Sequence, residues 1–191
     1  FTLPFSVPSY LAPHLGEALI DEDDPAVLAT VRDVTTRVSR LLEVGGDVSP
    51  GAFHRELGEI LYRGCGGERS EASLTEARRE VIELRERFWR EVSVPGSGEN
   101  VNQTLEKAGR VADFLDLAEL MIVDALDRRE SAGAHFRSEY QVDGEAKRDD
   151  RNWAFASAWQ SARDSSGRLS FIRHCEPLTF TAVPLATRSY A

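Results

Sequence analysis

Cysteine and histidine are scarce: the 191 residues include two cysteines and four histidines. Cys65 and Cys175 lie far apart and fit neither a metal-ligand spacing nor a disulfide framework, so two reduced thiols in a cytoplasmic protein are expected. The histidines form no HExxH pair, and the sequence has no GxSxG elbow, P-loop or GxGxxG fingerprint. The chain is therefore expected to contain no catalytic, cofactor-binding or metal-binding residue of its own.

Long apolar runs are also missing. The most apolar stretch, Leu115 to Leu126, contains Asp116, Glu119 and Asp124, and no run approaches the roughly 20 residues that cross a bilayer. The formal net charge is −9, with acidic and basic residues interspersed. Nucleic acid and anionic membrane surfaces require clustered basic residues, so neither is an expected partner. Direct membrane insertion is not expected either.

Four segments have the apolar periodicity of amphipathic helices. The first begins at Asp24-Pro25, which combines a capping carboxylate with a residue suited to the first helical position, and ends at Gly45-Gly46. The second begins at Ser49-Pro50, and the third at the capping-box pattern Ser73-Leu74-Thr75-Glu76. The fourth, residues 102–129, is apolar on two sides and is expected at the centre of a bundle. The stripe of the first helix comprises Val27, Val31, Val34, Val38 and Leu41, and the second stripe of the fourth comprises Val111, Phe114, Ala118, Met121 and Ala125.

The pattern changes after Ser131. Residues 132–152 are polar and aperiodic and predict a loop, whereas 153–159 and 169–173 flank a turn and predict a β-hairpin. Two prolines predict an extended tail from Pro177 to Ala191. The expected fold class is mainly α: an antiparallel three- to four-helix bundle, then a loop, a small β-hairpin and an extended C-terminal tail. The predicted boundaries are 1–22, 23–131 for the bundle, and 132–191.

The first residues are unusually apolar. Six apolar side chains lie at Phe1, Leu3, Phe5, Val7, Tyr10 and Leu11. So much apolar surface near a terminus is costly unless something covers it. Either this segment packs on its own domain, or it continues from a domain that precedes it.

A second unusual segment is the polar loop that follows the long helix. It places small residues, a histidine and several arginines between aromatic residues, and Arg suits carboxylate contacts and interface ion pairs. One interpretation is a junction that binds a partner domain, and the other is a salt-bridged loop that caps the long helix. Spacing alone favours neither. The candidate docking residues are Arg129, Glu130, His135, Arg137, Arg148 and Asp149.

The same loop carries a family resemblance. Glu130-Ser131-x-Gly133-Ala134-His135-x-Arg137, followed by Arg148-Asp149-Asp150-x-x-Trp153, resembles the C-terminal signature of succinate dehydrogenase and fumarate reductase flavoprotein subunits. The stretches 94–98 and 106–115 and the ending Thr187-Arg188-Ser189-Tyr190 are also similar to that family. Two features depart from the pattern: Ala132 stands where many relatives carry Arg, and residues 141–147 form an insert.

The resemblance implies a division of labour. A preceding FAD-binding domain would supply the flavin site and the groups that bind the dicarboxylate, with electrons passing to an iron–sulfur subunit and quinone. Residues 1–22 would continue from that domain, and this chain would be a non-catalytic docking domain, inactive alone, with FAD only in the full subunit. The complex would lie at the cytoplasmic membrane face through partner subunits.

Two alternatives remain open. An L-aspartate oxidase shares a related Glu-Ser-x-Gly-x-His segment, and a free-standing helical adaptor would need no enzymatic parent. The Arg-Asp-Asp-x-x-Trp run and the Arg-Ser-Tyr ending favour succinate dehydrogenase over the oxidase.

Overall fold

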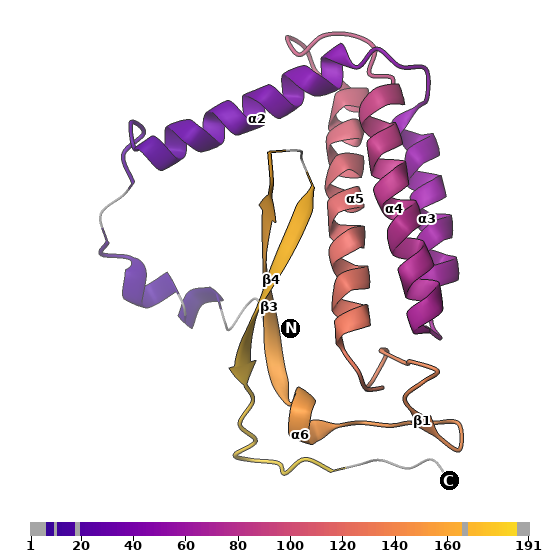
Figure 1. The fold of residues 1–191 in the computed structure, drawn as a ribbon. Coiled ribbons are helices and arrows are strands. Elements are labelled where there is room, and N and C mark those ends of the chain that lie inside the picture. Colours follow the sequence, from indigo (N-terminus) through magenta and orange to yellow (C-terminus); the bar gives the residue numbers. More distant parts are fainter. Residues whose placement is uncertain (1–6, 10, 18–19, 166–167, 187–191) are drawn as a thin grey trace. The chain divides into compact units, whose positions relative to one another are not determined.

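The structure is a computed structural model that describes residues 7–9, 11–17, 20–165 and 168–186. Contacts divide the chain into two units, Phe1–Arg40 and Leu41–Ala191. The first contains the 3-10 helix η1 (Ala12–His14) and most of helix α2 (Pro25–Glu43). The second contains α3 (Pro50–Cys65), α4 (Glu71–Glu91), α5 (Gln103–Asp127), β1 (Gln141–Val142), β2 (Glu145–Ala146), α6 (Asp150–Trp153), β3 (Phe155–Arg163) and β4 (Leu169–Pro177) (Figure 1). The predicted mainly α class, with a small antiparallel hairpin near the C-terminus, is confirmed.

Helix α2 begins as its sequence predicts. The Asp24 carboxylate accepts a hydrogen bond from the backbone N–H of Ala26 at 2.8 Å, and Pro25 is the first helical residue. Gly45, just beyond the helix, has a φ of +64°, the left-handed conformation expected at its end. The stripe differs from expectation: Val31 and Val34 are exposed, while Leu41 in the second unit is buried. Of the apolar start, Val7 and Leu11 are described and exposed; Phe1, Leu3, Phe5 and Tyr10 lie outside the described residues.

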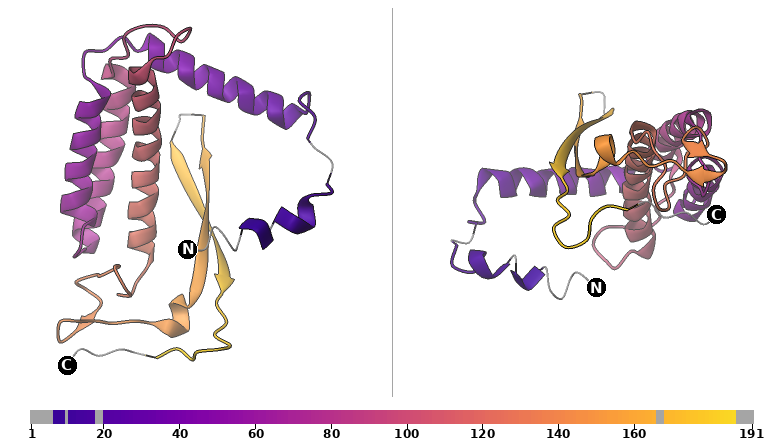
Figure 2. Two further views of the ribbon diagram at one scale, coloured as in Figure 1. Left: turned by 180° about the vertical axis from the view of Figure 1, so that it is seen from behind. Right: turned by 90° about the horizontal axis from the view of Figure 1, so that it is seen from below.

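Helices α3, α4 and α5 run side by side and share one core (Figures 1 and 2). Successive members are antiparallel, and backbone pairing of Val48 with Val92 fixes the start of α3 beside the end of α4. At Gly64 the first two helices approach closely, since a Cβ there would lie 2.5 Å from the Cβ of Ala77. The core is made of aliphatic side chains and two phenylalanines in edge-to-face contact, chiefly Phe53, Leu57, Leu74, Val81, Phe88, Val111, Leu115 and Ile122.

The helix starts show how local sequence fixes each boundary. Ser49 caps α3, and the Asn102 side chain accepts hydrogen bonds from Thr104 N and Leu105 N at the start of α5. The prediction for α4 was wrong by one turn. Its capping residue is Ser70, and the reciprocal box pairs Ser70 with Ser73, both backbone-to-hydroxyl distances being 3.0 Å. A serine hydroxyl replaces the Glu of the usual pattern at the third position.

The expected central position of α5 needs correction. On its second stripe, Val111, Ala118 and Ala125 are buried, but Phe114 and Met121 are exposed. Helix α5 is therefore one of three helices around a shared core, with one apolar strip facing outward.

The segment after α5 contains more regular structure than expected. Residues 141–146 form the short β1–β2 hairpin, and Trp153 ends the helix α6 instead of beginning a strand. The larger hairpin is longer than predicted, with β3 and β4 paired over nine residues from Phe155–Pro177 to Arg163–Leu169. It lies beside α5 (Figures 1 and 2). Residues 178–186 form neither helix nor strand.

Candidate functional site

The polar loop after α5 is fixed against the start of α4. Arg69 N donates to Phe136 O at 3.0 Å, and Ser138 N donates to Arg69 O at 2.8 Å, so Arg69 and Arg137 form a parallel bridge. Glu71 N, in the first turn of α4, donates to Glu139 Oε1 at 2.6 Å. The loop therefore joins two helix ends that are far apart in the sequence.

Arg137 caps the C-terminus of α5 from inside the protein. Its Nη1 donates to Ala125 O at 2.9 Å and to Leu126 O at 3.4 Å, carbonyls in the last turn of the helix. A cation there satisfies free acceptors and opposes the negative end of the helix dipole. The side chain is 2% exposed, its Nε lies 3.1 Å from Glu139 Oε2, and its guanidinium lies over the Tyr140 ring. These contacts agree with the interpretation in which the salt-bridged loop caps the long helix.

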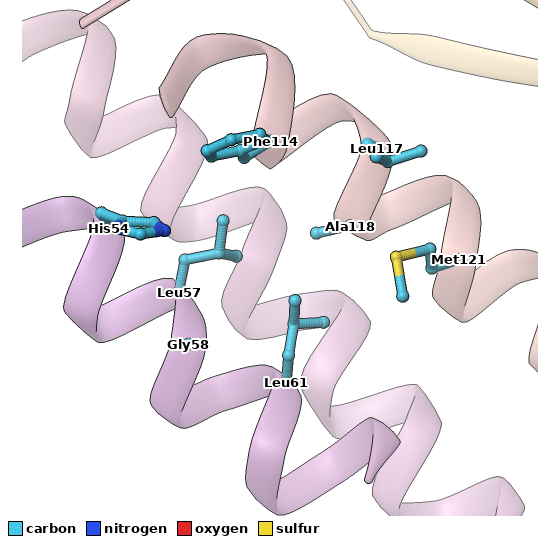
Figure 3. Close-up of a pocket in the computed structure, with 8 residues that line it drawn as sticks. All are labelled: His54, Leu57, Gly58, Leu61, Phe114, Leu117, Ala118 and Met121. Atoms are coloured by element: carbon cyan, nitrogen blue, oxygen red, sulfur yellow. The ribbon is translucent and has the colours of Figure 1, made fainter. Parts of the chain in front are cut away.

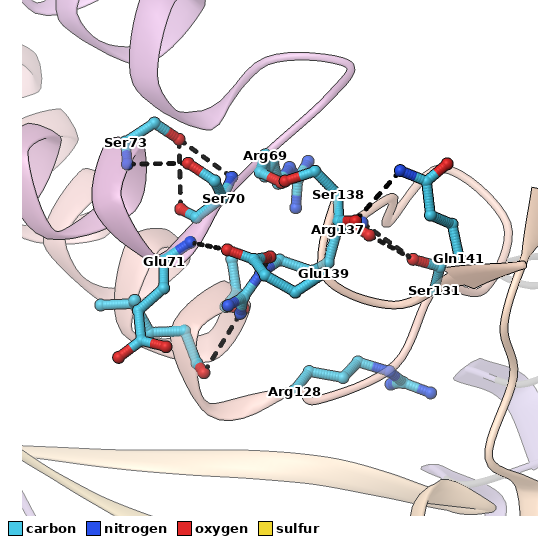
Figure 4. Close-up of polar contacts among 12 residues, drawn as sticks. Arg69, Ser70, Glu71, Ser73, Arg128, Ser131, Arg137, Ser138, Glu139 and Gln141 are labelled. Atoms are coloured by element: carbon cyan, nitrogen blue, oxygen red, sulfur yellow. Dashed lines mark hydrogen bonds and ion pairs between the residues drawn. The ribbon is translucent and has the colours of Figure 1, made fainter. Parts of the chain in front are cut away.

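Ser131 holds the backbone of this turn. Its Oγ accepts from Arg137 N at 2.8 Å and donates to Arg137 O at 3.2 Å, and the residue is fully buried (Figure 4). Ser131 N also donates to Lys147 O at 2.9 Å. The Ser131 hydroxyl thus makes the two hydrogen bonds to Arg137 that the backbone of a neighbouring strand would otherwise make.

His135 is held neutral in a single tautomer. Its Nδ1 faces Arg69 Nη1 at 3.1 Å and its Nε2 faces Arg128 O at 3.1 Å. A guanidinium only donates and a carbonyl only accepts, so Nδ1 accepts and Nε2–H donates. Burial lowers the pKa of His135, and the nearby charges of Arg69, Arg128 and Arg137 lower it further, against the hydrogen bond to Arg128 O.

Glu130 links the end of α5 to α6. Its Oε1 accepts from Arg128 Nε at 3.0 Å and Nη2 at 2.6 Å, and its Oε2 accepts from Asp149 N at 2.7 Å. Asp149 in turn caps α6, and Arg148 binds Asp150 and the backbone oxygen of Ala186. Glu130 is 2% exposed, so this buried carboxylate is paired on both oxygens.

The six candidate residues therefore fall into three groups. His135 and Arg137 belong to the turn beside α4, Glu130 with Arg148 and Asp149 belongs to the junction with α6, and Arg129 is exposed. Sequence reasoning missed Arg69 and Glu139. Arg69 lies 66 residues before His135, and no spacing pattern connects the two.

Glu139 is a bridging carboxylate. Burial raises its pKa, but the hydrogen bonds that it accepts, from Glu71 N and from Arg137 among others, outweigh burial and lower the pKa below its ordinary value. It links the first turn of α4 to the arginine that caps α5.

A buried ionic cluster lies between α4 and α5, away from the loop. Glu119 is 1% exposed; its Oε2 lies 2.6 Å from Arg85 Nη1 and its Oε1 lies 3.2 Å from Arg78 Nη2. Arg85 Nη1 also lies 3.7 Å from Asp116 Oδ1. The sequence signal was available, because Glu119 interrupts the most apolar stretch of the chain.

An apolar groove lies on the outward side of α3 and α5 (Figure 3). Its lining residues are His54, Leu57, Gly58, Leu61, Phe114, Leu117, Ala118 and Met121. Its volume is about 220 Å³, below the roughly 300–1,000 Å³ of small-molecule sites. The His54 ring lies against the Phe114 ring at a tilt of 33°, with centroids 5.6 Å apart, so this histidine packs as part of the groove wall.

Across the part of the chain that the structure describes, no three His, Cys, Asp or Glu side chains are arranged to hold a metal ion. None of the described helices is both long and apolar enough to cross a membrane.

Known proteins are similar to this chain over most of its length. Residues 54–190 match the sequence model of the fumarate reductase flavoprotein C-terminal region. The fumarate reductase flavoprotein subunit of Haemophilus influenzae is 32% identical over 128 residues, which are 67% of this chain and 20% of that protein. That of Escherichia coli K12 is 29% identical over 170 residues, 88% of this chain and 27% of that protein. The chain thus spans about a fifth to a quarter of these relatives.

Solved structures agree. A quinol-fumarate reductase structure with menaquinol molecules matches with a TM-score of 0.70 and 25% identity, over 92% of this chain and 29% of that one. Mycobacterium smegmatis Sdh1 in complex with UQ1 shares the fold alone, with a TM-score of 0.64 at 21% identity, over 90% of this chain and 26% of that one. Taken with the match over residues 54–190, these findings show that the chain belongs to the fumarate reductase flavoprotein C-terminal family.

Proposed function

We propose that the chain is the non-catalytic C-terminal domain of a flavoprotein subunit that interconverts succinate and fumarate. The match over residues 54–190 carries this proposal. The relatives named above are fumarate reductase flavoprotein subunits, which supports it over an L-aspartate oxidase or an adaptor. FAD, the dicarboxylate site and the proton-transfer groups would belong to a preceding domain, from which residues 1–22 continue. Hydride would pass between substrate and FAD there, and electrons would go to an iron–sulfur subunit and quinone at the cytoplasmic membrane face.

The domain would act by shape and rigidity. Its bundle has a closed apolar core, and its charged groups mostly hold one helix end against another. Protein contributions to flavin chemistry are positioning and electrostatics around the cofactor, and this domain would contribute by supporting the flavin domain. The proposed boundaries are the segment 1–22, the helical bundle 23–131 and the C-terminal region 132–191.

The loop after α5 is the proposed docking element, and its occupant is the flavin-binding part of the same subunit. Glu130, His135 and Arg137 are directed inward and fix the shape of the loop, whereas Arg129 is exposed beside them. The chain spans only about a fifth to a quarter of its relatives, so most of the subunit would lie outside it. A loop whose shape is fixed by buried polar contacts, with an arginine exposed beside them, suits contact with another folded domain.

A chimera tests this function. In the E. coli fumarate reductase flavoprotein subunit, the matched C-terminal region is replaced by this chain, and assembly, flavin content and fumarate reduction are measured. An assembled, flavin-containing, active chimera supports the proposal. Failure to assemble while this chain alone remains folded contradicts it. The isolated chain is expected to be colourless and inactive with succinate, and a flavin absorbance band would contradict the non-catalytic assignment.

Variants of the chimera test the docking element. Arg129→Ala is expected to weaken assembly without changing the stability of the isolated chain, because its side chain is exposed. His135→Ala and Arg137→Ala are expected to weaken both, because they remove contacts that shape the loop. Arg110→Ala, which removes an exposed arginine on α5 away from the loop, is the control. Equal assembly of Arg129→Ala, Arg137→Ala and the control would exclude this loop as the docking element.

A further inference from the structure

Helix α2 carries an exposed apolar stripe on one side. Val31 and Val34 are 56% and 57% exposed, and Leu28 and Val38 are exposed beside them. Their spacing of three and four residues places them along one face of the helix. Among the described residues of the unit Phe1–Arg40, none is buried. The described part of this unit therefore supplies no core that could cover the stripe.

The stripe is continuous with an interface that is already formed. Leu41 follows Val34 by two helical turns, on the same side of α2, and is 2% exposed in the core of the bundle. Leu42 also packs against that core. The last turn of α2 is therefore anchored by the bundle, whereas the turns before it need another surface.

The sequence of α2 gives it little helical stability of its own. The helix contains four valines and three threonines among its 19 residues, and β-branched side chains lose rotamer freedom in a helix. Thr30 Oγ1 also donates to Ala26 O at 2.9 Å, a local bond that slightly destabilises a helix. Most helical stability in proteins comes from packing of an amphipathic face. Residues 25–40 therefore depend on whatever covers the stripe.

The chemistry of α2 does not suit a lipid surface. Helices that lie in a membrane interface combine a basic polar side with an apolar side rich in leucine and aromatic residues. The stripe of α2 is mainly valine, and its opposite side mixes Arg32, Asp33 and Glu43. The acidic residues 21–24 come directly before the helix and would be repelled by anionic lipids. A folded protein surface is the better match.

A second copy of the chain is a poor match as well. Pairing of two α2 helices would use the stripe from Val27 to Leu41, which is about two heptads, whereas coiled coils need at least about three. Leu41 is also unavailable, because it is already buried in the bundle. Self-association would therefore leave much of the stripe uncovered.

The position of α2 along the chain indicates a more suitable partner. Residues 54–190 match a C-terminal region, and the matched part of the E. coli relative is 27% of that protein. Most of the relative's chain therefore precedes the region that the bundle matches. The unit Phe1–Arg40 also precedes it, so α2 lies between the bundle and that preceding part in chain order.

We propose that the apolar stripe of α2 is a docking surface for the flavin-binding part of the same subunit, and that residues 25–40 become stably helical only when that part covers them. The inference rests on the proposed function and adds a second contact to the loop after α5. Docking buries Leu28, Val31, Val34 and Val38, so ordering of α2 and assembly of the subunit are coupled.

Hydrogen–deuterium exchange tests the coupling by comparing the 191-residue chain with the E. coli chimera described above. Peptides from residues 25–40 are expected to exchange at least about tenfold more slowly in the chimera. Peptides of α4 are the reference, because its core is complete in the isolated chain, and they are expected to change much less. Equal exchange of residues 25–40 in both proteins would overturn the proposal. A dimer of the isolated chain with these residues protected, detected by sedimentation, would assign the stripe to a second copy and overturn it too.

Paired variants of the chimera test the stripe itself. Val31→Asp/Val34→Asp places two charges where docking would bury them and is expected to lower the yield of assembled, flavin-containing chimera at least about tenfold. The matched control is Thr36→Asp/Ser39→Asp, which adds two charges at exposed positions outside the stripe and is expected to assemble like the unmodified chimera. In the isolated chain, both double variants are expected to leave urea unfolding of the bundle unchanged.

The outcomes separate this inference from the function on which it rests. If the two double variants assemble equally well, the stripe is not a docking surface, and the proposed function stands without it. If the unmodified chimera fails to assemble while the isolated chain is folded, the proposed function and this docking surface are overturned together.

Discussion

Arg85 and Glu119 form an ion pair inside the bundle, with 2.6 Å between Nη1 and Oε2 and both residues buried between α4 and α5. Removing one partner of such a pair lowers the stability of the protein far more than replacing both partners. A single deletion leaves the other charge without compensation in a poorly solvated site.

Glu119→Ala is expected to lower the free energy of unfolding by about 3 kcal/mol, the lower end of the usual range, because Asp116 stays near Arg85. The double variant Arg85→Leu/Glu119→Leu is expected to recover most of that loss. Urea unfolding followed by circular dichroism measures both. The control is Glu106→Ala, which removes the exposed pair with Arg110 and is expected to cost less than about 0.5 kcal/mol. Equal losses at positions 119 and 106 would contradict a buried role.

Two of the three glycines of α3, Gly58 and Gly64, should respond oppositely to alanine. At Gly58 a Cβ meets nothing within 4 Å, so Gly58→Ala is expected to stabilise the protein by roughly 0.5–1 kcal/mol through helix propensity. At Gly64 a Cβ would lie 2.5 Å from Ala77 Cβ, so Gly64→Ala is expected to destabilise by about 1–3 kcal/mol. Thermal unfolding of both variants provides the comparison. A stabilising Gly64→Ala would show that α3 and α4 can separate freely.

The neutral His135 makes stability depend on pH. Its folded-state pKa is lowered, so the unfolded chain binds the proton more readily. The stabilisation is present above the unfolded pKa of about 6.5 and is lost as pH falls below it toward the folded value. Protonation would place a second N–H opposite Arg69. The difference in unfolding free energy between the wild type and His135→Gln, measured from neutral to mildly acidic pH, isolates this contribution. A constant difference across that range would refute it.

Arg137→Ala is expected to lower the free energy of unfolding by about 2–4 kcal/mol, because it leaves the terminal carbonyls of α5 and the Glu139 carboxylate without their donor. Arg137→Lys is expected to recover part of the loss, since an ammonium keeps the charge but not the planar fork of donors. Chemical denaturation measures the series. Arg129→Ala is the control, and a similar loss there would argue against a specific capping contact.

Helix boundaries followed from the sequence where one residue satisfies several free backbone groups. Asp24, Ser49 and Asn102 each begin a helix within a residue or two of the predicted place. The start of α4 was misplaced because Ser70 and Ser73 both fit a capping position, and only the fold selects between them. Trp153 was misassigned because Asp149 caps a one-turn helix, a signal too short to show periodicity.

The candidate loop was located by its composition, but its organisation was not predictable. The inward direction of Arg137 depends on where α5 ends, and the partner of His135 comes from the turn before α4. Burial of Glu119 similarly depends on Arg78 and Arg85 reaching it from a neighbouring helix. Spacing within one segment carries no information about contacts between segments.

The bridge between Arg69 and Arg137 joins strands of chain 68 positions apart, which bears on the order of folding. Adjacent helix pairs need only short connections to meet. Forming this bridge instead closes a long loop, which costs conformational entropy. The α3–α4 and α4–α5 contacts are therefore expected to form before the rate-limiting barrier and the bridge after it. Weakening the bridge would then speed unfolding while leaving the folding rate nearly unchanged, so this loop would govern how long the folded domain persists.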